Sequence, residues 1–166
     1  MLAKLSAFAL VGIDAMPVEV EVDVAAGLPK TILVGLPELA VRESVHRIER
    51  ALANLGYQRP AGRTIVNLAP ADLKKDAGAF DLPIGLGMLV ATGQLLPEQL
   101  RDFAIVGELV LSGNLRPIKS VLPMAIVVGV VSSTVLAKSS AASDNGLQLS
   151  QNAPALTGEL PARGVG

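Results

Sequence analysis

The chain has 166 residues, a length that suits one compact domain burying roughly 70% of its unfolded surface. Hydrophobic residues make up 51% of it and aromatic residues only 2%, so aliphatic side chains must build the core. The lack of cysteine excludes disulfides and thiolate zinc sites, the single histidine excludes a multi-histidine metal site, and the formal net charge of −1 gives no global basic excess for nucleic acid.

Three strands and a helix are predicted in the first third of the chain. Residues 4–13 fit a strand better than a signal peptide, since charges interrupt the apolar run. Residues 17–24 alternate valine with acidic residues, which is typical of a strand with one face in water, and 31–34 form a more buried strand. Apolar residues at helical spacing predict a helix over about 37–55, which Gly56 should end.

The middle of the chain predicts a strand, a loop and a central helix. A strand over 63–68 leads into a polar loop over 69–78. The next helix, over about 81–95, is apolar on nearly all sides and should therefore be buried. Asp81 can cap its start, with Pro83 in its first turn.

Residues 103–111 are predicted to form one strand, which turns back into a hairpin. A helix near 121–131 and a strand near 134–137 would close the fold. The uncharged run over 121–137 has only the minimum length for a membrane span. Because it contains Pro, Gly and Ser, a core helix and strand are expected there, and no membrane association.

The composition changes after residue 138. Residues 139–166 are rich in Ser, Ala, Gly and Pro without apolar periodicity, which predicts a disordered tail or linker. Strands and helices alternate only in part over residues 1–138. The expected fold class is therefore α/β of the α+β kind, a mixed sheet packed with helices.

Three stretches carry long motifs in a fixed order. They are residues 18–44, residues 64–89 with NLAPAD and FDLP, and residues 106–125 with GELVLSGNLRP and VLPMA. Over roughly residues 1–126 the chain thereby resembles the N-terminal domain of the bacterial ComM/YifB family of magnesium-chelatase-like AAA+ ATPases.

This resemblance implies a ribosomal-protein-S5 domain-2-like fold, which Lon protease also uses. It further implies an AAA+ ATPase module in the same chain and a cytoplasmic homo-hexamer that acts as a branch-migration helicase on DNA during natural transformation. After about Val127 the sequence departs from the family pattern and the ATPase part is absent, as expected of a designed fragment, a truncation or a frameshift product.

The same resemblance bears on proteolysis. Lon-type proteases use a serine nucleophile and a lysine base, and their positions fall on Ala79, within residues 75–81, and on Leu122. Because a methyl group cannot attack a carbonyl and an isobutyl group cannot accept a proton, the catalytic dyad is predicted to be vacant.

Nucleotide hydrolysis by the chain alone is also not expected. No GxxxxGK[ST] phosphate-binding loop occurs. Gly85 and Gly87 are isolated in apolar surroundings, which is typical of close helix packing. We therefore expect no cofactor and no metal.

Three carboxylates, Asp72, Asp76 and Asp81, gather around the loop and the helix start. They could form a metal or acid/base site. Helix capping and pairing with Lys74 and Lys75 is the simpler interpretation.

Glu108 lies inside an apolar strand and would need a partner such as Arg63 or Arg116 if it points inward. His46 follows the apolar stripe of the first helix and should face solvent.

A local basic patch is conceivable, because strand 63–68 leads directly into the loop. Arg59, Arg63, Lys74 and Lys75 could meet near one edge and contact phosphates or another subunit. Aromatic platforms for stacking single-stranded bases are absent.

The leading hypothesis is a non-catalytic Lon-like accessory domain that helps assemble or regulate a hexameric ATPase and could guide DNA toward its pore. One alternative is a Lon-like peptidase with an unorthodox site around Lys74, Lys75 and Asp76. Another is a weak DNA-binding module that uses Arg63, Lys74 and Lys75.

Overall fold

The computed structural model describes residues 1–35, 39–73, 78–116, 118, 124 and 134–136. The first half contains β1 (Leu2–Val11), β2 (Asp14–Ala25), β3 (Lys30–Val34), α1 (Leu39–Asn54) and β4 (Arg63–Ala69). The second half contains α2 (Asp81–Ala91), the 3-10 turn η1 (Pro97–Gln99), β5 (Phe103–Ile105), β6 (Glu108–Leu109), β7 (Leu115–Arg116) and β8 (Thr134–Leu136).

Six strands form one mixed sheet in the order β3-β4-β2-β1-β5-β8, while β6 and β7 form a separate hairpin. The β1–β2 and β2–β4 pairs are antiparallel. The β3–β4, β1–β5 and β5–β8 pairs are parallel. The predicted mixed sheet packed with helices is confirmed, and the S5-like topology stays a prediction.

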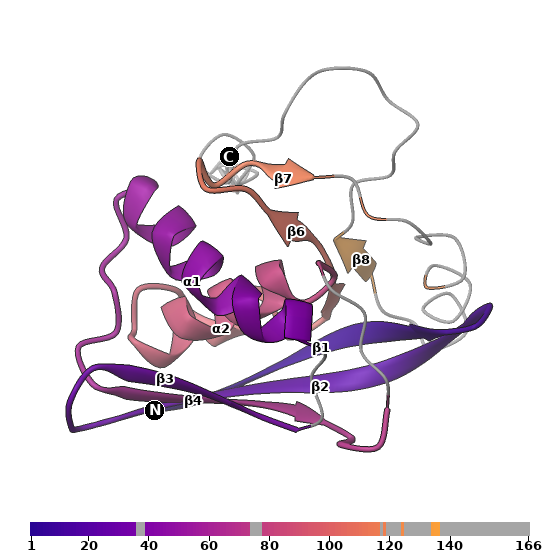
Figure 1. Cartoon of the computed structure of the whole chain (residues 1–166), viewed down its shortest axis with the longest axis horizontal. Coiled ribbons are helices and arrows are strands. Elements are labelled where there is room, and N and C mark those ends of the chain that lie inside the picture. The colour runs from indigo at the N-terminus through magenta and orange to yellow at the C-terminus, as the bar shows by residue number, and fades with distance from the viewer. Residues whose placement is uncertain (36–38, 74–77, 117, 119–123, 125–133, 137–166) are drawn as a thin grey trace, which may run out of the picture.

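Both helices lie on one side of the sheet (Figure 1). Helix α2 contacts β1 and β2, and α1 packs on α2. All of α2 except Leu86 is buried, so the prediction of a central helix is confirmed.

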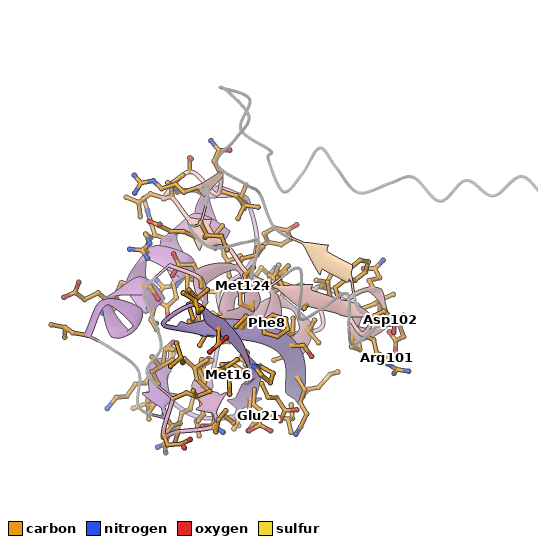
Figure 2. All side chains as sticks on the ribbon, turned by 90° about the vertical axis from the view of Figure 1, so that its right-hand side faces the viewer. Phe8, Met16, Glu21, Arg101, Asp102 and Met124 are labelled. Carbon is orange, nitrogen blue, oxygen red and sulfur yellow. The ribbon has the colours of Figure 1, made fainter. Side chains whose placement is uncertain are left out.

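The alternation in β2 sorts its side chains between the two faces of the sheet. Val18, Val20 and Val22 are buried beneath the helices. On the other face Nζ of Lys4, in β1, lies 3.0 Å from Glu19 Oε1 and 2.7 Å from Glu21 Oε1. Hydrogen bonding to Lys4 lowers the pKa of Glu21, and the same contacts raise the pKa of Lys4. Figure 2 shows Glu21 and Met16 along this hairpin.

The far end of β1 is covered on both faces. Ala7 and Phe8 point to opposite sides of a strand, yet both are buried. Phe8 belongs to the same buried cluster as Met124 (Figure 2).

The prediction of one strand over 103–111 is wrong. The chain forms β5, leaves the large sheet at Gly107, and then forms β6 of the separate hairpin. The reason is that Gly107 is bound to the start of α2: its N–H donates to the Ala79 carbonyl at 3.0 Å, and its carbonyl accepts from Leu82 N at 2.9 Å. The predicted turn into β7 is confirmed.

Helix α2 ends at Ala91 and not near residue 95. The Thr92 hydroxyl donates to the Met88 carbonyl at 2.8 Å, and Gly93 adopts a φ of 74° that stops the helix. Helix α1 ends as predicted, with Gly56 at a φ of 88°. Strand β8 confirms the strand near 134–137, whereas the predicted helix over 121–131, apart from Met124, and the tail over 139–166 lie outside the described residues.

Candidate functional site

The start of α2 is the place where the family resemblance locates the catalytic serine. Gly78 is buried with a φ of 91°, and Ala79 is half-buried beside the core. Ala79 therefore occupies a turn held to Gly107, and Phe80 separates it from Asp81, the first residue of α2. The structure describes this first position of the predicted vacant dyad, while Leu122, the second, lies outside the described residues.

Glu108 stands next to this turn. A Cβ atom placed on Gly78 would lie 3.1 Å from Glu108 Oε2, a tight contact, and the φ of 91° is itself one that favours glycine. Glu108 pairs with Arg116, whose Nη1 donates to Oε1 at 3.3 Å. The expected structural partner is thus confirmed as Arg116 rather than Arg63, and the pair is partly exposed.

Asp81 does not cap α2, and this prediction is wrong. Phe80 occupies the N-cap without a side-chain hydrogen bond. Asp81 is only 1% exposed, because its side chain points into the protein instead of back to the helix start. Its Oδ2 accepts hydrogen bonds from Arg47 Nε at 3.0 Å, from Arg47 Nη2 at 2.7 Å and from Leu109 N at 3.1 Å.

The Asp81 carboxylate therefore joins α1, the start of α2 and β6. Burial raises the pKa of Asp81, and the hydrogen bonds and charge of Arg47 oppose that shift without cancelling it. Asp81 and Arg47 are 34 residues apart, and no local motif in the sequence pairs them. The sequence does not reveal this contact, because helical spacing indicates only on which face of α1 Arg47 lies and not which distant residue it meets.

A second polar group lies between α1 and β3. Glu49 of α1 accepts hydrogen bonds from the Thr31 hydroxyl and from Arg59 Nη2. These residues line a cavity of about 910 Å³, with Lys30, Leu33, Val45 and His46 among its other walls. His46 is exposed, as predicted. The cavity itself was not predicted, because its walls come from segments distant in sequence.

The predicted basic patch is only partly placed. Arg63 is exposed at the first residue of β4, whereas the 69–78 loop begins at the opposite end of this strand, about 20 Å away at 3.3 Å per residue. Arg63 lies instead beside Lys30 of β3. The strand thus separates Arg63 from the start of the loop. That the strand leads directly into the loop is therefore no reason for Arg63 to lie near Lys74 and Lys75.

The carboxylates predicted to cluster with this loop are also divided. Asp72 is exposed and Asp81 is buried. Asp76, Lys74 and Lys75 lie outside the described residues. Within the described ranges, no three carboxylate or imidazole side chains come together to hold a metal ion.

Comparison with known proteins identifies the family. The family described as "Subunit ChlI of Mg-chelatase" matches residues 20–138. The chain belongs to this family. Among its ChlI-family relatives, "Competence protein ComM" of Haemophilus influenzae is 47% identical over 115 residues, which are 69% of this chain and 23% of the relative. "Uncharacterized protein YifB" of Escherichia coli is 44% identical over 117 residues, 70% of this chain and 23% of the relative.

A more distant relative is "Uncharacterized protein Rv2897c" of Mycobacterium tuberculosis, 36% identical over 125 residues, 75% of this chain and 25% of the relative. The resemblance to the ComM/YifB family is thus confirmed, and the chain spans about a quarter of these relatives' length. Among the residues that the structure describes, no helix combines the length and the apolar character needed to cross a membrane.

Proposed function

We propose that this chain is a non-catalytic, Lon-like accessory domain of a ComM-like, magnesium-chelatase-like AAA+ ATPase. It would comprise residues 1–138, followed by a linker over 139–166. Its task would be to help assemble or regulate a cytoplasmic ATPase hexamer that processes DNA, as in natural transformation. ATP hydrolysis and any helicase activity would belong to the ATPase module of the full-length protein.

The observation that carries this proposal is the chemistry of the turn before α2. A nucleophile there would need a hydroxyl or thiol beside a base. The chain has the methyl group of Ala79, and the adjacent polar pair is Glu108 with Arg116. Gly78 lets the Glu108 carboxylate pack against this turn. This arrangement supports a structural role for the turn, in packing, rather than a catalytic role in attack on a carbonyl.

The relatives support the second half of the proposal. One of them is named a competence protein, and each is about four times as long as the matched part. The 166 residues contain no GxxxxGK[ST] loop, so the phosphate-binding groups of an ATPase would have to lie elsewhere in a full-length protein.

The test uses the full-length relative and a version without the segment that corresponds to residues 1–126. We expect the deletion to weaken hexamer formation, measured by sedimentation, or the unwinding of branched DNA. Binding of ATP should remain. A matched control carries Glu108→Gln and Arg116→Gln, which alter the polar pair but keep the fold. If the deletion changes neither assembly nor unwinding, the accessory role is wrong.

The peptidase alternative is tested on the 166-residue chain. The proposal predicts that casein is not cleaved and that Lys75→Ala changes nothing. Cleavage that Lys75→Ala abolishes would instead establish an unorthodox hydrolytic site.

A further inference from the structure

Strand β3 lies at one edge of the six-stranded sheet. Among the described residues it pairs only with β4, so its outer row of backbone N–H and C=O groups is free. Natural proteins usually protect such edges with several charges, prolines or bulges. The strand Lys30–Val34 has one charge and no proline, and its last three residues are apolar.

The space beneath this edge is open. The 910 Å³ cavity lies between α1 and the inner face of β3 and β4. On the side of the strands it is lined by Thr31, Leu33 and Thr64. Its volume lies in the range of clefts that hold ligands. Val45 of α1 and Leu33 form an apolar part of its wall. Side chains on the inner face of a strand added to β3 would therefore find room.

Large apolar side chains are exposed at both ends of β3. Leu28, two residues before it, is 87% exposed, and Val34, its last residue, is 44% exposed. Leu39 at the start of α1 is 69% exposed. Exposed apolar side chains such as Leu28 and Val34, at the two ends of a strand with an unpaired edge, are consistent with a protein-binding surface.

One end of the outer face of the same edge is cationic, and Ile32 and Val34 continue this face along β3. Lys30 and Arg63 are register partners on β3 and β4, so they share the face opposite to Thr31 and Thr64. Both are exposed, and Arg59 flanks the edge at the cavity mouth. Glu49, the acidic residue in the cavity wall, is already bound by Thr31 and Arg59.

We propose that the β3 edge binds an extended polypeptide segment that alternates apolar and acidic residues, as an added strand. Its backbone would pair with β3, its apolar side chains would enter the cavity over Leu33 and Val45, and a carboxylate would lie beside Lys30, with Arg63 one strand further in. A second copy of β3 fits less well, because it would bring another lysine and no carboxylate to this edge.

The protein itself supplies a suitable probe sequence. Residues 18–24 of β2, VEVEVDV, alternate in the required way, and residues 19–24 already pair with β4 in the sheet. We would titrate a fluorescent, end-capped VEVEVDV peptide into the 166-residue chain by anisotropy. Hydrogen exchange would report where it binds.

We expect saturable binding that slows amide exchange within Lys30–Val34. A VKVKVKV peptide should bind at least about tenfold more weakly, as should the Lys30→Glu/Arg63→Glu variant, because each change replaces attraction between opposite charges at the rim with repulsion between like charges. The matched control is Arg101→Glu, a charge reversal at the exposed turn before β5 (Figure 2), which should leave binding unchanged.

Equal binding of the acidic and lysine peptides, or protection of other strands without β3, would overturn the proposal. So would a dimer of the chain alone that Lys30→Glu dissociates, or a DNA oligonucleotide that displaces the peptide with higher affinity. The comparison of the two peptides needs no variant, so it remains decisive if a substitution unfolds the protein.

Discussion

At the scale of single residues, Asp81 has the most unusual environment among the described carboxylates. It begins a helix, where an acidic side chain normally stays in water and interacts with the helix dipole. Here it is buried and shared between Arg47 of α1 and the backbone of β6. Its contribution is therefore to hold three elements together, which a helix cap would not do.

Replacing Asp81 with alanine should lower the free energy of unfolding by about 2–4 kcal/mol, because Leu109 N and Arg47 lose a charged acceptor. Urea denaturation measures this loss. Asp102→Ala, at the exposed turn beside Arg101 (Figure 2), should change stability by less than about 0.5 kcal/mol. Equal effects of the two substitutions would show that the buried contact contributes no stability.

Two carboxylates should respond to pH in opposite directions. The raised pKa of Asp81 means that the folded chain holds its proton more tightly, so this group favours folding below its ordinary value of 3.8 and less as pH rises through the folded value. The lowered pKa of Glu21 means that its contribution is present above 4.5 and lost as pH falls through the folded value.

Consequently, the stability of the wild type relative to Asp81→Asn should grow on acidification, and its stability relative to Glu21→Gln should shrink. Urea denaturation at several pH values between about 3 and 7 gives both differences. If both stability differences changed in the same direction with pH, the two pKa shifts could not have opposite signs. Burial raises the pKa of Asp81, whereas hydrogen bonding lowers that of Glu21.

At the scale of elements, the glycines of α2 allow the helix to approach the sheet. A Cβ atom on Gly87 would lie 2.6 Å from Val22 Cγ2 and 3.1 Å from Leu5 Cδ1, both in the core. A Cβ atom on Gly85 would lie 3.3 Å from its nearest neighbour, Ile48 Cγ2. The predicted role of both glycines in close packing is thus better supported at Gly87.

Gly87→Ala should therefore be more destabilising than Gly85→Ala, by about 1–2 kcal/mol. Both substitutions gain the same helix propensity, about 1 kcal/mol, so their difference reports packing against the sheet. Thermal and urea denaturation of the two variants measure it. If Gly87→Ala is the more stable of the two, α2 lies farther from β1 and β2 than the structure places it.

At the scale of the whole molecule, the proposed division of the chain at residue 138 can be tested. Strand β8 ends at Leu136 and pairs with β5, so it should be needed for the sheet. The predicted linker over 139–166 should add no stability, because it lacks apolar periodicity.

A chain that ends at residue 138 should keep the midpoint of thermal unfolding of the full chain within about 2 °C. A chain that ends at residue 126, where the clear family motifs stop, should unfold at lower temperature, because it loses β8. Circular dichroism during heating measures both. A large drop on removing residues 139–166 alone would place part of that segment in the folded domain.

Much of the architecture follows from local patterns. The valine–acid alternation predicts β2, the apolar stripe and Gly56 predict α1 and its end, and the apolar composition of residues 81–95 predicts a buried helix there. These patterns suffice because helix and strand periods involve neighbours a few residues apart. The motifs around NLAPAD and FDLP also identify the family.

Contacts between distant segments required the folded chain. Asp81 could have capped its own helix, but the fold offers it Arg47 and Leu109 N instead. Residues 103–111 could have formed one strand, but binding of Gly107 to the start of α2 divides them between two sheets. Lys30 meets Arg63 through a parallel crossover that no local pattern specifies. The periodicity of the sequence determines which face of each segment is apolar and therefore buried. Which element packs on that face depends on the distant surfaces that the folded chain brings to it.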